Sequence, residues 1–172
     1  MVIVRPEKPD DIPSIRLINE RAFGQLQEAD LVDSLRLTCP DALSLVAVSG
    51  QAVVGHILFT PVMVEGHADL TRGMGLAPMA VLPGYQRRHI GTHLVKTSLD
   101  ILRQSHCPFV IVLGHPTYYP RFGFVPASQR GLRCQWADVP DQAFMVLILD
   151  EVVMSGVSGV VRYRDEFGLA MT

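Results

Sequence analysis

The chain has 172 residues, 48% of them hydrophobic and 19% charged, and its formal net charge is −2. This length is typical of one domain that buries a core without disulfides or metals, and the charge excludes a nucleic-acid binder that acts through an overall positive potential. No apolar run reaches membrane-spanning length and the N-terminus lacks the pattern of a secretory signal, so we predict a cytoplasmic protein with no nucleic-acid or membrane partner.

The N-terminal part of the chain reads as one short strand and two helices. Residues 2–4 predict the strand, and Asp10 or Asp11 is expected to cap the helix that follows. The apolar residues of this helix recur at helical spacing: Ile12, Ile15, Ile18 and Ala22. A second short helix is expected over residues 28–35.

From Leu43 the pattern changes to that of β-strands. Ser49-Gly50-Gln51 predicts a hairpin turn before a long strand over residues 52–64. Thr60-Pro61 interrupts this strand, which predicts a sheet edge or a bulge there. A turn is expected at residues 66–69 and another strand at 72–82, in which Pro78 predicts a break in the pairing.

The second half of the chain alternates strands and helices. Residues 83–92 predict a turn that leads into a helix whose apolar face is Leu94, Val95, Leu99 and Leu102. The unbroken apolar run 109–113 is typical of a strand covered on both faces. A short helix over residues 117–122 should end at Gly123, and 143–149 is the clearest later strand. The order of elements predicts an α+β (mixed α/β) sandwich with a central sheet flanked by helices.

Charge is distributed unevenly along the chain. Residues 7–33 hold seven acids and three bases, whereas residues 84–103 hold four bases and one acid. Two ordinary solvated helix faces would explain this. The alternative is a protein with one surface for a cation and another for an anion.

The turn at residues 86–92 is the clearest candidate site. Free backbone N–H groups and the positive end of the helix dipole make a strand-turn-helix junction an anion site. Arg87 and Arg88 suggest phosphate, and Gly91 lets a ligand approach the backbone. The segment is neither a P-loop nor a GxGxxG motif.

Two ordered segments resemble a known family. Residues 76–92, LAPMAVLPGYQRRHIGT, are similar to the acetyl-CoA motif of the GNAT (GCN5-related) N-acetyltransferases, and Tyr118-Tyr119-Pro120-Arg121-Phe122-Gly123-Phe124 resembles their second signature. The string from Leu113 to Phe124 is similar to the YhbS-like bacterial subgroup of predicted acetyltransferases. The resemblance covers nearly the whole chain. It implies a single domain over residues 1–172 with the GNAT-like acyl-CoA N-acyltransferase sandwich, whose central mixed sheet is splayed.

The resemblance also implies roles for individual residues. The backbone of Met79, Ala80 and Val81 would bind the pantetheine arm of acetyl-CoA, the cosubstrate. The pyrophosphate would be cradled by the turn, which comprises Arg87, Arg88, His89, Ile90, Gly91 and Thr92. Tyr119 matches the tyrosine that protonates the departing CoA thiolate in many relatives. A packed aromatic residue is the structural alternative for Tyr119.

His89 departs from the family pattern because it stands where the motif has its first glycine. A side chain is acceptable there if the backbone φ is negative. Its imidazole would then face solvent or add a pH-dependent contact to phosphate.

The general base is not fixed by the sequence. Glu28 on the second helix and His115 near Tyr119 are candidates, acting through water. Each has a structural alternative, and the amine could instead lose its proton to bulk water.

Metal and thiol chemistry are not expected. The three cysteines, Cys39, Cys107 and Cys134, have no metal-binding spacing and are expected to be reduced and packed. His89 and His93 stand four residues apart without further ligands nearby, so no metal is predicted.

The predicted function is acetyl-CoA-dependent N-acetylation of an amine by direct attack in a ternary complex. A catalytically silent acyl-CoA-binding or sensing protein of the same fold is the alternative, and a longer acyl group stays open. The acceptor amine is not identified, although the acidic 7–33 stretch would suit one with several positive charges. Many members of the family dimerise through C-terminal strands, so a homodimer is one option for the oligomeric state.

Overall fold

A computed structural model describes residues 1–67 and 71–170, with the backbone alone at 169 and 170. The predicted turn at 66–69 therefore lies partly outside the described residues. The chain divides into two compact units. The first comprises residues 1–60, 77–100 and 165–172, and the second comprises 61–76 and 101–164. The single domain over residues 1–172 stays a prediction.

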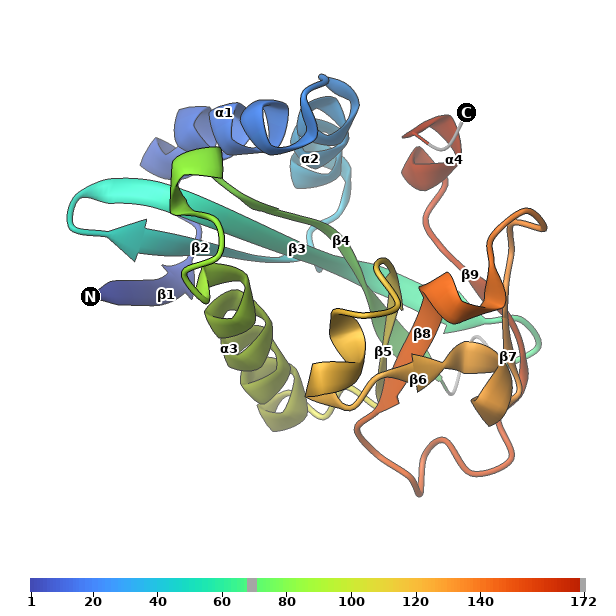
Figure 1. The fold of residues 1–172 in the computed structure, drawn as a ribbon. Helices are drawn as coiled ribbons and strands as arrows, with labels where there is room; N and C mark the ends of the chain where they lie inside the picture. Colours follow the sequence, from blue (N-terminus) through green and yellow to red (C-terminus); the bar gives the residue numbers. More distant parts are fainter. Residues whose placement is uncertain (68–70, 171–172) are drawn as a thin grey trace. The chain divides into compact units, whose positions relative to one another are not determined.

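The helices and strands follow the predicted order (Figure 1). The strands are β1 (Val2–Pro6), β2 (Leu43–Ser49), β3 (Ala52–Val64), β4 (Arg72–Val81), β5 (Phe109–Leu113), β6 (Val125–Pro126), β7 (Leu132–Cys134), β8 (Phe144–Ile148) and β9 (Gly159–Arg162). The α-helices are α1 (Ile12–Phe23), α2 (Gln27–Thr38), α3 (Ile90–Gln104) and α4 (Glu166–Ala170). The predicted α+β class is confirmed.

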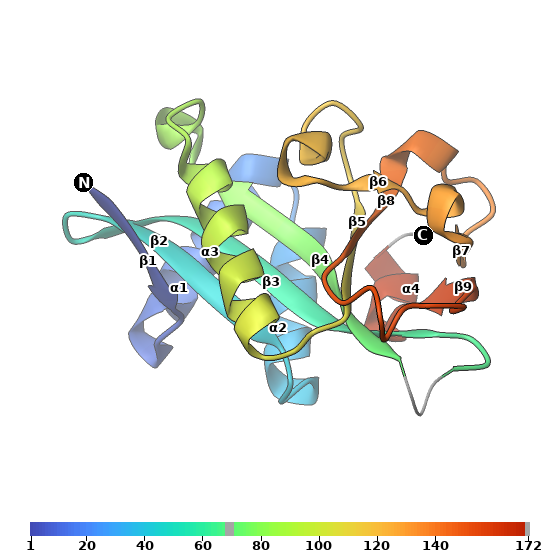
Figure 2. The same cartoon turned by 90° about the horizontal axis from the view of Figure 1, so that it is seen from below.

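The first unit holds the strand order β1-β2-β3-β4, and β1, β2 and β3 pair antiparallel. Adjacent residues of a strand point to opposite faces of the sheet, and β3 packs against helices on both faces. Gly55 faces α3, where a β-carbon would stand 3.1 Å from Leu94 and 3.2 Å from Ile90, whereas His56 faces Asn19 of α1. Figures 1 and 2 show α3 on one face of these strands and α1 and α2 on the other.

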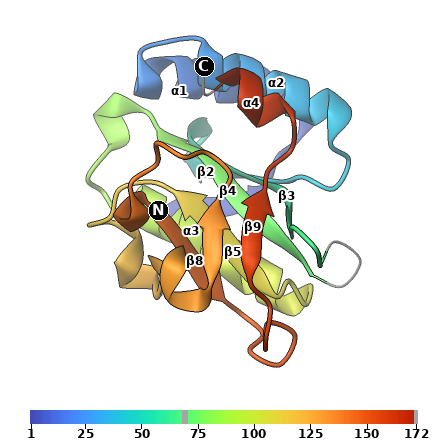
Figure 3. The ribbon, with the colours of Figure 1, turned by 90° about the vertical axis from the view of Figure 1, so that its right-hand side faces the viewer.

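Helix α3 is anchored by its apolar face. The four residues predicted for this face are at most 3% exposed: Leu94, Val95, Leu99 and Leu102. Burial of each such side chain contributes about 1.5–3 kcal/mol. The helix start is therefore held firmly at the end of the turn that precedes it. At the other end of the chain, α4 lies beside α2 in Figure 3, where Thr38 Oγ1 donates to Glu166 Oε1 at 2.7 Å.

The second unit contains the ladders β4-β5-β8-β6 and β3-β9-β7. Strand β5 pairs parallel with β4 and antiparallel with β8, and its residues Phe109 to Val112 are at most 1% exposed. The predicted strand covered on both faces is confirmed. The β4–β5 ladder ends at the pair Leu76–Val112, two residues before Pro78, where the sequence predicts a break. The Ala77–Pro78 peptide bond is cis.

Two local expectations were wrong. Strand β3 continues through Thr60-Pro61, and the register shift lies at Ala47/Val48. On one edge of β3, Pro61 lies between the β2 partners, which end at Phe59, and the β9 partners, which begin at Met63. A residue without an N–H removes no bond from either ladder.

The other wrong expectation concerns the cap of α1. Asp11 stands at the N-cap position without capping the helix. Its carboxylate instead accepts from Arg5 Nη1 at 2.6 Å and from the Lys8 N–H at 2.7 Å. The guanidinium of Arg5 holds the pKa of Asp11 below its usual value.

Candidate functional site

The turn between β4 and α3 is fixed at both ends by backbone hydrogen bonds. The Leu82 N–H donates to the Val54 carbonyl at 2.9 Å, and a short 3₁₀ turn, Pro83–Tyr85, follows. Gln86 Nε2 then donates to the Val81 carbonyl at 3.0 Å. Each of these bonds lies within the first unit. The turn is thus anchored on β3 and on the last residue of β4.

The backbone of this turn alternates in handedness. Arg87 and His89 both have φ of +61°, the left-handed region that side chains rarely adopt. The condition of a negative φ at His89 is therefore not met. Arg88 and Ile90 do not have a positive φ, so the sign of φ alternates from residue 87 to residue 90, and such alternation turns successive N–H groups toward one side as in an anion-binding nest. The sequence did not show this, because an exposed loop residue carries no local signal for the sign of its φ.

The first turn of α3 continues the nest. The first helical bond runs from the His93 N–H to the His89 carbonyl at 2.9 Å, so the amides of residues 90–92 precede it and lack partners within the helix. The buried Ile90 side chain, 3% exposed, packs against Gly55 of β3. The side chains of Arg87, Arg88 and His89 are exposed around this turn.

The last residues of β4 offer backbone groups. Ala80 is buried, whereas Met79 and Val81 are half-buried. These three residues belong to the first unit, beyond the end of the β4–β5 ladder at Leu76. Their backbone therefore lies outside the β4–β5 pairs.

Tyr119 lies in the second unit on a short 3₁₀ turn, Tyr119–Phe122, and is 6% exposed. Its ring contacts Tyr118 edge-on at a centroid distance of 5.1 Å and Phe124 at 5.7 Å. Burial, and to a smaller extent Tyr118, raises its pKa above the ordinary value. The phenol therefore stays protonated across the physiological range and can serve as a donor.

The two candidate bases lie in different units. Glu28 is on α2 in the first unit, where both carboxylate oxygens accept from Gln25 Nε2 at 2.9 and 3.1 Å. His115 is exposed in the segment between β5 and Tyr119. In the second unit it follows Gly114 directly, on which the Tyr119 ring packs.

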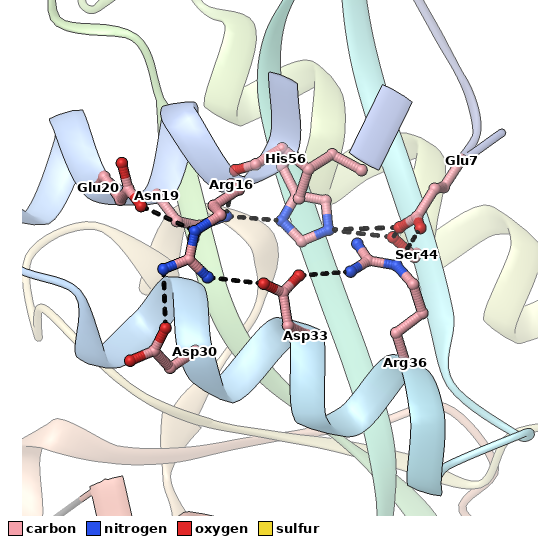
Figure 4. A network of polar contacts seen from close by, with 10 residues as sticks. Glu7, Arg16, Asn19, Glu20, Asp30, Asp33, Arg36, Ser44 and His56 are labelled. Carbon is pink, nitrogen blue, oxygen red and sulfur yellow. Dashed lines mark hydrogen bonds and ion pairs between the residues drawn. The ribbon is translucent and has the colours of Figure 1, made fainter. Parts of the chain in front are cut away.

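Most of the acids in residues 7–33 already have cationic partners. Arg16 pairs with Glu20, Asp30 and Asp33 at 2.9, 2.9 and 2.6 Å, as Figure 4 shows. Arg36 pairs with Glu7 and Asp33, and Arg5 pairs with Asp11. Five of the seven acids are thus paired, and the interpretation of this stretch as a free surface for a multiply charged amine loses its support.

A buried polar cluster within this network was missed by the sequence analysis. His56 of β3 is fully buried; its Nδ1 is 3.2 Å from Asn19 Nδ2, and its Nε2 is 3.0 Å from Ser44 Oγ. Ser44 in turn donates to Glu7. Burial lowers the pKa of His56 to about 4. The available signal was the presence of Ser44 and His56 at inward positions of otherwise apolar strands.

The described part of the chain contains neither a membrane-spanning helix nor a cluster of metal ligands. No helix within it is long and apolar enough to span a membrane. No three His, Cys, Asp or Glu side chains in residues 1–67 and 71–170 come together as metal ligands would. The three cysteines are free, and burial raises the pKa of Cys107 to about 11. Such a thiol is a poor nucleophile at neutral pH.

Comparison with known proteins bears on the whole chain. Residues 3–127 match the acetyltransferase (GNAT) domain family. The chain is 37% identical over 167 residues to the N-acetyltransferase YhbS of Escherichia coli K12, which covers 96% of this chain and 98% of that protein. The crystal structure of E. coli YhbS in complex with CoA superposes with a TM-score of 0.89 at 36% identity, covering 97% of this chain and 92% of that one.

A second solved structure carries the acetylated cosubstrate. The GNAT family acetyltransferase of Brucella melitensis in complex with acetyl-CoA has a TM-score of 0.78 at 31% identity, covering 97% of this chain and 98% of that one. These similarities confirm the GNAT-like sandwich and the likeness to YhbS predicted from the two segments.

Proposed function

Because the chain belongs to the GNAT family of acetyltransferases, we propose that it is an acetyl-CoA-dependent enzyme that transfers the acetyl group to a primary amine by direct attack in a ternary complex. The observation that carries this proposal is the turn at residues 86–92. Its alternating backbone supplies a nest of N–H groups directly before the firmly packed helix α3. Relatives with CoA and with acetyl-CoA support the choice of cosubstrate.

The first unit supplies the cosubstrate contacts in this proposal. Backbone amides from Arg87 to Thr92 hold the pyrophosphate, aided by the positive end of the α3 dipole. The backbone of Met79, Ala80 and Val81 binds the pantetheine arm as an added strand would. Both groups of contacts are made by main-chain atoms, which are held by the strand and helix rather than by rotatable side chains.

The reaction forms one bond and breaks one. The neutral amine adds its lone pair to the thioester carbonyl carbon, and an N–H of Met79 or Ala80 stabilises the oxyanion. The tetrahedral intermediate then expels the sulfur with the electron pair of the C–S bond, and the nitrogen gives up a proton. Tyr119 donates its phenolic proton to that sulfur and regains one from solvent.

The proton from the amine has three routes in this proposal. Glu28 and His115 stay candidate bases that act through water, and bulk water is the third route. The Glu28 carboxylate is already engaged by Gln25, and His115 is exposed. These surroundings do not favour either residue as the base, so variants of both Glu28 and His115 should be measured for thiol release.

A thiol-release assay tests the proposed function. The protein is incubated with acetyl-CoA and a panel of primary amines, and free CoA thiol is measured. Amine-dependent release is expected for at least one acceptor class. A preceding thermal-shift scan against acyl-CoAs of increasing chain length should show stabilisation by acetyl-CoA. Stabilisation without release for any amine would instead favour the catalytically silent acyl-CoA-binding protein.

A further inference from the structure

A surface hollow of about 460 Å³ lies beside the first two turns of α3. It is lined by two apolar residues, Val2 of β1 and Ile90 of α3, and by five polar residues of the turn and the helix: Arg88, His89, Thr92, His93 and Lys96. All of these residues belong to the first unit. The hollow therefore depends only on the placement of β1 and the start of α3, both of which that unit contains.

The polar lining of the hollow consists of donors and cations. His93 and Lys96 stand three residues apart on α3 and so share one helix face, and His89, which directly precedes the helix, lines the same hollow. The guanidinium of Arg88 sits over the Tyr85 ring at 5.5 Å, which limits its freedom. Among the described residues no carboxylate lines the hollow, and Asp100, one turn beyond Lys96, is outside its lining. This composition suits a dianion such as a phosphate monoester.

The hollow adjoins the proposed pyrophosphate turn. Arg88 and His89 belong to both, since their backbone forms the nest and their side chains line the hollow. Lys96 is about 9 Å farther along the helix axis than Ile90, the first residue of α3. The nucleotide of CoA carries its pyrophosphate and a separate phosphate monoester on the same ribose. A nucleotide with its pyrophosphate in the turn would therefore need a second anion site a short distance away.

We propose that this hollow binds the 3′-phosphate of the cosubstrate's adenosine, and that Lys96 is the residue through which the enzyme prefers CoA to 3′-dephospho-CoA. The proposal rests on the proposed function, because it needs the pyrophosphate in the turn. It adds a specificity-determining contact on the side chains of α3, whereas the turn binds through its backbone.

Calorimetric titration of the wild-type protein with CoA and with 3′-dephospho-CoA tests the proposal. We expect CoA to bind about tenfold more tightly. Lys96→Gln keeps a side chain of similar length and should weaken CoA binding about fivefold, as expected for one partly exposed ion pair. The same variant should leave the dissociation constant of 3′-dephospho-CoA unchanged. Arg21→Gln, which removes an exposed cation from α1, is the matched control and should alter neither constant.

Two results would overturn the proposal. One is equal affinity of the wild-type protein for the two ligands. The other is an equal loss of both affinities in Lys96→Gln, because that would indicate a general electrostatic effect. Failure of the proposed function is distinguishable, because it shows either as no binding of either ligand or as binding without thiol release for any amine.

Discussion

The ring of Tyr119 packs directly on the backbone of Gly114: a β-carbon at residue 114 would stand 2.5 Å from Tyr119 Cε2 and 3.1 Å from Cδ2. Gly114 is not one of the described glycines with a positive φ, so the backbone conformation does not require glycine at this position. The close approach of the Tyr119 ring does require it. The residue directly after β5 therefore determines where the proposed proton donor lies.

Gly114→Ala should displace Tyr119. Overpacking of this kind costs about 1–3 kcal/mol of stability, and we expect a lower kcat with little change in the dissociation constant of acetyl-CoA. Gly84→Ala, where a β-carbon meets no atom within 4 Å, is the matched control. If Gly114 acts on turnover through the Tyr119 hydroxyl, Gly114→Ala should reduce kcat no further in the Tyr119→Phe background. A further reduction there would indicate a general disturbance of the second unit.

Tyr119→Phe removes the proton donor and keeps the packed ring. Proton donation by a positioned acid contributes about 10²- to 10⁴-fold in rate, so thiol release should fall by that order while acetyl-CoA affinity stays unchanged. The ring contacts with Tyr118 and Phe124 are retained, and thermal unfolding should confirm that the fold is intact. Full activity of the variant would remove Tyr119 from the role of acid.

His89→Gly should not destabilise the protein, because His89 directly precedes α3 and glycine is among the residues favoured at that position. The φ of +61° at His89 strains a side-chain residue by about 1 kcal/mol or more, and glycine adopts it freely. Denaturant unfolding of His89→Gly and His89→Val should rank the valine variant as the least stable. Similar stability of the two variants would contradict the left-handed conformation.

The same glycine variant tests the imidazole contact to phosphate. A protonated imidazole attracts phosphate and a neutral one does not. Wild-type affinity for acetyl-CoA should therefore rise as the pH falls from 8 to 6, and His89→Gly should reduce this rise. Identical pH profiles for the two proteins would mean that His89 makes no such contact.

The buried His56 predicts a loss of stability in acid. Its pKa is lowered from 6.5 to about 4 in the folded protein, chiefly by burial. Between these two pKa values the unfolded chain therefore binds a proton at His56, whereas the folded chain does not. Stability that is fully present above pH 6.5 is lost as the pH falls toward 4, by up to about 3 kcal/mol.

The geometry around His56 explains why it resists protonation. Asn19 Nδ2 donates to the Ile15 carbonyl at 2.9 Å, which fixes the amide so that its NH₂ group faces His56 Nδ1. His56→Gln should be less stable at pH 7 but should show a flatter decline between pH 6.5 and 4. His115→Gln, which removes an exposed imidazole, should leave the decline unchanged. The readout is the free energy of unfolding in urea at each pH.

The sequence by itself determined the elements and the candidate turn. The apolar face of α3, the fully covered strand β5 and the end of the β4–β5 ladder near Pro78 follow from local patterns, because the period of apolar residues and the missing N–H of proline act within a few residues. The motifs at 76–92 and 118–124 are likewise continuous in the chain, and they were enough to indicate the family.

Only the tertiary structure decided the environment of individual side chains. The acidic stretch 7–33 read as an open surface, yet Arg36 and Arg5 neutralise part of it from outside that stretch. The burial of His56 depends on Asn19, which is 37 residues away. The left-handed φ of His89 is set by a turn held between β3, β4 and α3. In each case the environment of the side chain depends on partners that folding brings together. The spacing of these partners in the sequence does not indicate that they will be in contact.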